Sequence, residues 1–243
     1  MSDVATRILH SLAAVDGERH RRATHPGVPG RVRALKAWQH ARFARTHADL
    51  LESPRHSLAA RFFLDELYGP QDFTQRDAQF ARIVPTLVRL FPQDIVETVQ
   101  SLAEVHALSE RLDTAMAMSL GEAVLDRAGY VRAWQSTGEP KSRARQIALV
   151  LDVGAAMDRH TRSLMLRASL RAMRGPARAA GLGSLQAFLE AGFEAFGAMR
   201  GSEEFLRMIA ERERALAQRL FEPDAVASVT GAPAAGDPLA HLP

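Results

Sequence analysis

The sequence predicts an all-α protein, a bundle of about nine to eleven helices in a single domain. Alanine and leucine, both strong helix formers, dominate the chain of 243 residues. Apolar residues recur at helical spacing through most of it, and β-branched residues nowhere alternate over more than four positions. With 47% hydrophobic residues, the chain is long enough to bury a sizeable core. Together these observations favour helices packed on helices.

The N-terminal part is predicted to contain two helices joined by a loop. A first helix covers residues 2–15, and the polar segment 17–30 carries two Pro-Gly pairs, which favour a loop. The next helix covers residues 31–51. Gln39 and Phe43 belong to the same face of it, because they recur at helical spacing.

Two start signals and one internal proline organise the next segment. Ser53 followed by Pro54 predicts a helix start, with a capping hydroxyl and a proline in the first turn, and this helix ends near Gly69. Thr74 opens a further helix with a pattern that resembles a capping box. Pro85 lies inside that helix and is expected to kink or split it.

The rest of the bundle is predicted as a series of helices separated by glycine and proline. Their expected ranges are 92–118, 121–134, 141–158, 160–174, 185–200 and 202–221. Beyond Pro223 the chain is rich in Ala, Pro and Gly without helical periodicity, which predicts disorder. The expected organisation is an N-terminal helix and basic loop (1–30), a helical bundle domain (31–221) and a disordered tail (222–243).

Composition and missing motifs exclude several function classes. The chain has no cysteine, which rules out disulfides, thiolate metal sites and cysteine nucleophiles. It shows no signal-peptide pattern and no run of roughly 18 apolar residues, so we expect a cytoplasmic protein that does not enter a membrane. Glycine-rich phosphate loops, His-Glu-x-x-His, Gly-x-Ser-x-Gly and Glu-x-x-His are all absent. The sequence therefore leaves open whether the protein is an enzyme.

A polar seam interrupts the apolar face predicted for the helix 92–118. His106 and Asp113 fall inside the apolar stripe at 100° per residue, and Glu110 lies at its edge. Buried polar groups need partners, so such a seam requires a reason. One interpretation is a ligand, metal or proton-transfer site. The other is a core histidine that is hydrogen-bonded to a carboxylate and fixes the register of the helices.

A second candidate site is the corner between the helices that precede and follow Gly69. Two acids lie within an aromatic helix, and a turn and an Arg-Asp pair follow. The residues concerned are Asp65, Glu66, Tyr68, Arg76 and Asp77. One interpretation is that this corner lines a pocket. The other is a well-specified connection between two helices and nothing more.

Three segments of the sequence resemble a family of uncharacterised helical bacterial proteins. They are FFLDELYGPQDFTQRD at 62–77, LSERLD at 108–113 and FLEAGF at 188–193. The resemblance extends over roughly residues 55–221. It implies an all-helical fold and carries no activity, cofactor or site residue with it.

The basic charge of the chain is concentrated at its N-terminal end. The formal net charge is +3, but residues 1–61 hold eleven Lys/Arg against five Asp/Glu, a surplus of six. The candidate polyanion-binding residues on the helix 31–51 are Arg31, Arg33, Lys36, His40, Arg42 and Arg45. They indicate a footprint for nucleic acid or another polyanion. The alternative is a solvated arginine face in a chain with only two lysines.

Because no catalytic motif is present, the sequence predicts a non-enzymatic helical binding or interaction protein. Its expected partner is another protein or a second copy of the chain in a homodimer. The first alternative is a metal- or haem-binding bundle that uses His106, Glu110 and Asp113. The second is a protein that binds a polyanion or nucleic acid through its basic N-terminal region. The sequence identifies no specific metal, cofactor or catalytic residue.

Overall fold

The computed structural model describes residues 3–67, 69–231, 234 and 236–243. Within these residues the chain forms thirteen α-helices, one π-helical turn and one 3-10 helix, and no strand. The prediction of an all-α, single-domain protein is confirmed. Four of the α-helices have only five or six residues, and the other nine are longer. No helix in the described part of the chain is long and apolar enough to cross a membrane.

The helices follow one another along the chain with short connections. Their bounds are α1 Asp3–Ala23, α2 Val28–Thr46, α3 Ala48–Glu52, α4 Ser57–Phe62, the π-helical turn η1 Phe63–Leu67, α5 Thr74–Leu90, α6 Gln93–Leu120, α7 Arg127–Thr137, α8 Pro140–Thr161, α9 Leu164–Ala172, α10 Arg174–Ala179, α11 Gly183–Met199, α12 Glu203–Leu220, α13 Ala225–Thr230 and the 3-10 helix η2 Pro238–His241.

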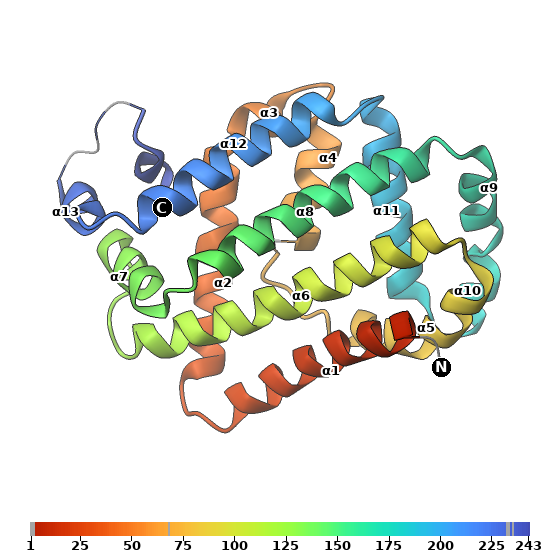
Figure 1. The fold of residues 1–243 in the computed structure, drawn as a ribbon, viewed down its shortest axis with the longest axis horizontal. Coiled ribbons are helices and arrows are strands. Elements are labelled where there is room, and N and C mark those ends of the chain that lie inside the picture. The colour runs from red at the N-terminus through yellow and green to blue at the C-terminus, as the bar shows by residue number, and fades with distance from the viewer. Residues whose placement is uncertain (1–2, 68, 232–233, 235) are drawn as a thin grey trace.

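Two sets of helices cross each other in the bundle (Figure 1). The first set is α1, α6, α8 and α12, which succeed one another from the bottom to the top of the view and contact each other in that order. The second set is α2, α4 and α11, which run across the first; α2 packs on α6, and α11 packs on α4 and α8. The long helix α6 lies at the centre and contacts α1, α2, α5, α7 and α8.

The basic loop predicted at 17–30 is mostly helical. The first helix does not stop at residue 15 but continues through Gly17 to Ala23. Arg22, in its last turn, is buried and donates a hydrogen bond of 2.7 Å from Nε to Thr114 Oγ1 on α6. Gly27, with φ of 79°, then turns the chain into α2. Packing against α6 thus extends the helix over residues whose local pattern favours a loop.

The corner between α4 and α5 differs in detail from the predicted one. Thr74 is the first residue of α5, but the predicted capping box does not form, because the N-cap residue is Phe73 and makes no side-chain hydrogen bond. Asp72 Oδ1, just before the helix, accepts a hydrogen bond of 2.8 Å from the Thr74 amide. Pro85 lies inside α5, which continues to Leu90 and is not split. Ser53 Oγ accepts a hydrogen bond of 3.3 Å from the His56 amide. Residues 54–56 form a turn, however, and the helix begins at Ser57, later than predicted.

The described residues of the C-terminal segment 222–243 are packed, whereas the sequence predicted disorder there. Leu239 and Leu242 are fully buried, at 0% exposure, in a cluster with Trp134 and Val229. The segment η2 contacts α2, α12 and α13, and Arg45 donates a hydrogen bond of 3.0 Å to the Leu242 carbonyl. A few isolated leucines anchor this segment, and such spacing leaves no periodic signal in the sequence.

Candidate ligand-binding cavity

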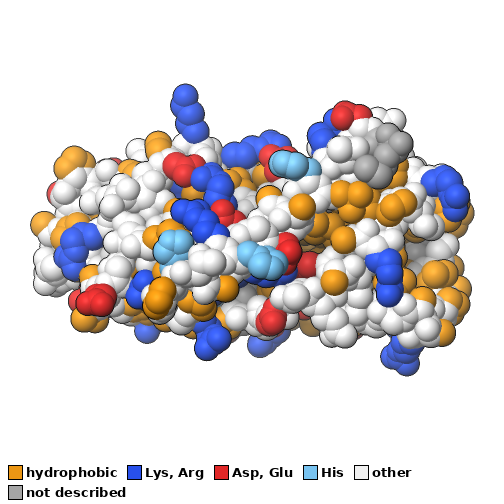
Figure 2. All heavy atoms as spheres, turned by 90° about the horizontal axis from the view of Figure 1, so that it is seen from below, with side chains coloured by type: hydrophobic (Ala, Val, Ile, Leu, Met, Phe, Trp, Pro, Cys, Tyr) orange, Lys and Arg blue, Asp and Glu red, His pale blue; other side chains and the backbone are white. Residues whose placement is uncertain are grey.

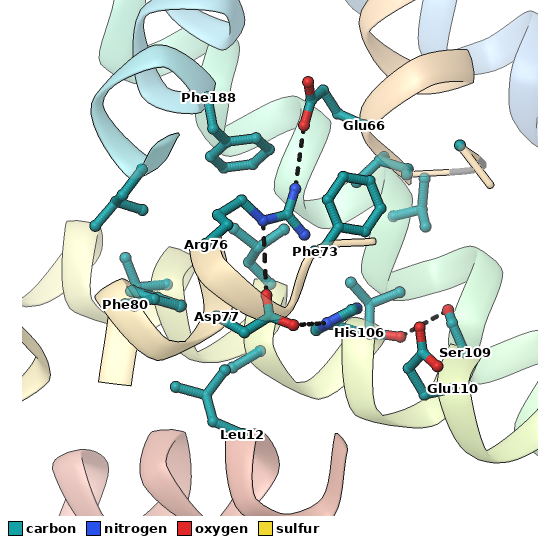
Figure 3. A pocket seen from close by; sticks show the side chains of 18 of the residues that line it. Leu12, Glu66, Phe73, Arg76, Asp77, Phe80, His106, Ser109, Glu110 and Phe188 are labelled. Atoms are coloured by element: carbon teal, nitrogen blue, oxygen red, sulfur yellow. Dashed lines mark hydrogen bonds and ion pairs between the residues drawn. The ribbon is translucent and has the colours of Figure 1, made fainter. Parts of the chain in front are cut away.

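A cavity of about 120 Å³ lies in the middle of the bundle, and we call it the central cavity. Its wall is contributed by α1, α2, η1, α5, α6, α8 and α11. Most of the wall is apolar, with Leu12, Phe80, Leu102 and Leu185 among its side chains. Polar side chains interrupt this apolar lining: those of η1, α5 and α6 are seen in Figure 3, and α2 and α8 contribute others. The arrangement combines an apolar surface with fixed charges.

Asp77 is the centre of one polar cluster in the wall of the cavity (Figure 3). Its Oδ2 lies 2.8 Å from His106 Nε2 and 2.5 Å from Arg19 Nη2, while its Oδ1 lies 3.6 Å from Arg76 Nε. Burial raises the pKa of Asp77, but the hydrogen bonds from His106 and Arg19 and the charge of Arg76 outweigh it and bring the pKa to about 2. Asp77 is therefore ionised at neutral pH.

The ionised Asp77 determines the tautomer of His106. A carboxylate only accepts hydrogen bonds, so Nε2 of His106 carries the proton that Asp77 receives. When the ring is neutral, Nδ1 is then its basic nitrogen. The hydrogen bond to Asp77 thus fixes the orientation of the His106 ring, as a carboxylate does for histidines in binding sites and in acid–base catalysis.

Arg76 joins the same cluster through both its charge and its flat face. Its guanidinium lies between two rings, 3.8 Å from the centroid of Phe73 and 4.8 Å from that of Phe188 (Figure 3). Nη1 donates a hydrogen bond of 3.1 Å to Glu66 Oε2. Burial raises the pKa of Glu66, although the charge of Arg76 opposes this. The stacked rings and the two carboxylates hold the guanidinium in one orientation.

Glu110 anchors a second polar cluster, one turn along α6 from His106. Arg22 from α1 and Lys36 from α2 both form ion pairs with its carboxylate, and Arg22 also donates 2.7 Å to its backbone carbonyl. Burial raises the pKa of Glu110, but Lys36 and Arg22 outweigh it and lower the pKa to about 2. This ion-pair cluster connects three helices at the wall of the cavity.

Asp113 lies next to Glu110 but has a different electrostatic environment. Its Oδ1 accepts a hydrogen bond of 3.2 Å from Gln39 Nε2, and its side chain is buried. Burial raises the pKa of Asp113, and the neighbouring Glu110 adds to this effect, while Lys36 opposes it. The pKa of Glu110 is thus lowered and that of the neighbouring Asp113 is raised, and perturbed pKa values of this kind are common at functional sites.

The structure brings two separately predicted candidate sites to one cavity. The seam residues His106, Glu110 and Asp113 all line it. So do three of the five corner residues, namely Glu66, Arg76 and Asp77. Asp65 points elsewhere, because its side chain is 58% exposed and lies 3.4 Å from His40 Nε2. Tyr68 lies outside the described residues.

The basic residues of α2 do not form one surface. Lys36 lines the cavity, and Arg42 is buried in an ion pair with Glu213. The other four are placed separately: Arg31 donates to the Ala117 carbonyl at 3.3 Å, His40 faces Asp65, Arg45 donates to the Leu242 carbonyl, and Arg33 is exposed. On the face seen in Figure 2, Asp, Glu and His side chains lie among the Lys and Arg side chains.

The seam does not have the geometry of a metal site. Among the described residues, no group of three or more His, Asp or Glu side chains is arranged to hold a metal ion. His106 hydrogen-bonds to Asp77, and Glu110 is engaged by two cations. His106 and Glu110 are thus both held by partners within the chain.

A smaller chamber of about 40 Å³ adjoins the central cavity, and we call it the second chamber. Gln39 and Gln146 line both spaces. Arg143 stacks over the ring of Trp134 at 3.9 Å and lines the second chamber with it. The indole Nε1 of Trp134 is buried without a hydrogen-bond partner.

Of the residues that line the second chamber, the sequence singled out Arg42 as a candidate, but as part of a basic surface. The available signal was Gln39, a polar residue within the face of α2 that also carries Phe43. Phe73 was also missed as a cavity residue, since an aromatic side chain in a helical protein resembles a core residue in the sequence.

A family model described as a domain of unknown function (DUF8198) matches residues 18–227. Neither the curated proteins nor the solved structures provide a match. The matched range includes all the helices that form the central cavity except the first part of α1, which contributes Leu12.

Proposed function

Because the chain belongs to the DUF8198 family, whose description names no activity, we propose a function from the cavity itself. The protein binds a small, mainly apolar molecule in the central cavity and orients it by a polar group. The observation that supports this proposal is an apolar cavity whose polar side chains are already held in place by ion pairs. Asp77 and Glu110 hold these clusters together, with Arg76 and Lys36 as lining partners.

The energetic cost of an unfilled space argues against a packing defect. Protein interiors are close-packed, and each cubic ångström of cavity costs about 24 cal/mol. A closed, dry and apolar cavity of 120 Å³ would cost about 3 kcal/mol, which is the upper bound for the apolar part of this one. That is a large share of the roughly 5–15 kcal/mol that stabilises a typical protein. A bound ligand recovers this free energy through contacts with the apolar wall.

The volume indicates the size of the ligand. An engineered apolar cavity of about 150 Å³ in another protein binds benzene. The central cavity is of comparable size, at about 120 Å³. Drug-sized ligands occupy pockets of roughly 300–1,000 Å³, and a haem is larger still. The volume thus favours a ligand with about one six-membered ring, and it does not favour the haem alternative.

A titration with benzyl alcohol tests the proposal, because this probe combines one apolar ring with one hydroxyl. We expect calorimetry to show saturable binding with a dissociation constant on the order of 1 mM, about −4 kcal/mol. The variant Ala103→Leu, which fills the cavity from α6, should abolish binding while the protein stays folded. Its matched control is Ala168→Leu, at an exposed position of α9, which should bind like the wild type.

Two results would contradict the proposal. One is no saturable binding by the wild-type protein. The other is equal binding by the wild type and by Ala103→Leu, which would place the probe somewhere other than the cavity. Circular dichroism of both variants checks that they keep the helical fold.

A further inference from the structure

We infer that the ligand of the central cavity is an alcohol or a phenol, and that its hydroxyl donates a hydrogen bond to Nδ1 of His106. This inference rests on the proposed function and names the chemical class of its ligand. The apolar body of such a ligand occupies the cavity among the apolar side chains of the wall. Its hydroxyl lies at the polar cluster that surrounds Asp77.

His106 presents a hydrogen-bond acceptor in the wall of the cavity. Its Nε2 donates to Asp77 Oδ2 at 2.8 Å, and because Asp77 is ionised, this nitrogen keeps the proton. A neutral imidazole carries one N–H, so its Nδ1 has a lone pair that accepts a hydrogen bond. Among the residues that the structure describes, none forms a hydrogen bond with this Nδ1. A ligand that donates a hydrogen bond supplies the missing partner.

The ring of His106 is held in place before any ligand binds. The carboxylate that orients it is itself fixed, since Arg19 Nη2 lies 2.5 Å from Asp77 Oδ2 and Arg76 Nε lies 3.6 Å from Asp77 Oδ1. The ring of Phe73 packs edge-on against the imidazole, with the ring centroids 6.4 Å apart. Figure 3 shows these groups gathered around Asp77. Because the acceptor is already ordered, a ligand loses little free energy in orienting it.

Arg76 adds a donor to the same cluster. Its guanidinium lies between the rings of Phe73 and Phe188, so its two faces are covered. Its Nη1 donates to Glu66, and its Nε faces Asp77 (Figure 3). The remaining nitrogen, Nη2, has no hydrogen-bond partner in the described part of the chain. The cluster therefore offers a ligand one acceptor, at His106, and one donor, at Arg76.

A hydroxyl group is complementary to both of these atoms, because it donates one hydrogen bond and also accepts. An ether or a carbonyl only accepts, so it leaves Nδ1 of His106 without a partner. An ammonium group only donates, so it leaves Nη2 of Arg76 without one. A carboxylate only accepts, and its charge would lie close to the ionised Asp77. The cluster thus favours a neutral hydroxyl over these four groups.

Three probes of equal size separate these possibilities. Benzyl alcohol, its isomer anisole and ethylbenzene share one ring and the same number of heavy atoms, but they carry a hydroxyl, an ether oxygen and no oxygen. An apolar cavity without a polar cluster would favour ethylbenzene, because a buried hydroxyl that lacks a partner costs free energy. We expect calorimetry to show that benzyl alcohol binds more tightly than ethylbenzene and about tenfold more tightly than anisole.

Variants of His106 test which residue accepts the hydrogen bond from the hydroxyl. His106→Gln can still donate an N–H to Asp77 but lacks the ring nitrogen Nδ1, and His106→Leu lacks both groups. In each variant, benzyl alcohol should bind about tenfold more weakly, whereas ethylbenzene binding should not weaken. His10→Leu, at an exposed position of α1, is the matched control and should change neither. Two variants keep the test valid if one of them does not fold.

The ring nitrogens of His106 give a readout that is independent of affinity. Nitrogen NMR distinguishes protonated from unprotonated ring nitrogens, and the signals of His106 are those that disappear in His106→Gln. We expect Nε2 to carry the proton and Nδ1 to be unprotonated in the free protein. Benzyl alcohol should shift the Nδ1 signal, and ethylbenzene should leave it in place.

The outcomes separate the inference from the proposed function. Anisole or ethylbenzene binding as tightly as benzyl alcohol, or a proton on Nδ1 in the free protein, would overturn the inference and leave the proposed function standing. A preference for benzyl alcohol that both His106 variants retain would assign the hydroxyl to another acceptor of the wall, such as Asp113, and would also overturn the inference. If none of the three probes binds, the proposed function itself fails.

Discussion

Replacing Glu110 by glutamine should remove a large, pH-dependent part of the stability. The folded protein holds the pKa of Glu110 at about 2 against an ordinary value of 4.5, since Lys36 and Arg22 outweigh the effect of burial. One unit of pKa corresponds to 1.36 kcal/mol, so the shift is worth about 3 kcal/mol. Removing one partner of a buried ion pair costs about 3–5 kcal/mol, which agrees with this value.

The sign of the pH dependence follows from the lowered pKa. Above pH 4.5 the carboxylate is ionised in both states, and the folded state gains the full contribution. As the pH falls from 4.5 to about 2, the unfolded state binds a proton that the folded state does not, and the contribution is lost. The wild type and Glu110→Gln should therefore differ most at neutral pH and converge as the pH approaches 2.

Urea unfolding followed by circular dichroism between pH 7 and pH 2.5 measures this difference. The matched control is Glu104→Gln, which breaks an exposed ion pair with Arg145 on the same helix. Because exposed pairs contribute about 0–1 kcal/mol, the control should stay within 1 kcal/mol of the wild type at every pH. If Glu110→Gln followed the wild type in parallel at all pH values, the assigned role of Glu110 would be refuted.

Three further predictions concern other parts of the molecule. Leu239→Ala should cost about 2–5 kcal/mol in urea unfolding because Leu239 is fully buried; a change below 0.5 kcal/mol would show that the C-terminal segment is not packed. Gly129→Ala should cost about 1–3 kcal/mol, since a Cβ at this position would clash with the backbone oxygen of Val124, and an unchanged melting temperature would contradict that contact. We propose that the predicted homodimer forms through α9, where Leu164 is 79% and Met165 72% exposed: Leu164→Ser with Met165→Ser should halve the mass in light scattering, and an unchanged dimer would exclude this face.

The fold class was predictable because helical periodicity is a local property. The 28 residues of α6 and the start of α5 at Thr74 agree closely with the sequence pattern. The end of α1 was not predictable, because contacts with α6, such as that of Arg22 with Thr114, extend the helix past Gly17. Its bounds depend on residues about 90 positions away in the sequence.

The candidate site was predictable in pieces but not as a whole. His106 was recognisable as a polar residue in an apolar stripe, and Asp77 as part of a polar corner. That Asp77 binds His106, 29 residues away, depends on how α5 packs on α6 and leaves no trace in either local pattern. For the same reason, Lys36 looked like part of a basic surface, whereas it lies beside Glu110.

The central claim is that the cavity holds a small ligand, and a crystal structure of the protein soaked with benzyl alcohol tests it most directly. We expect electron density for one ring among Phe80, Leu102 and Leu185, with the hydroxyl directed toward the polar side chains of α6. Side chains closed over this space, with the probe absent or bound only at the surface, would contradict it.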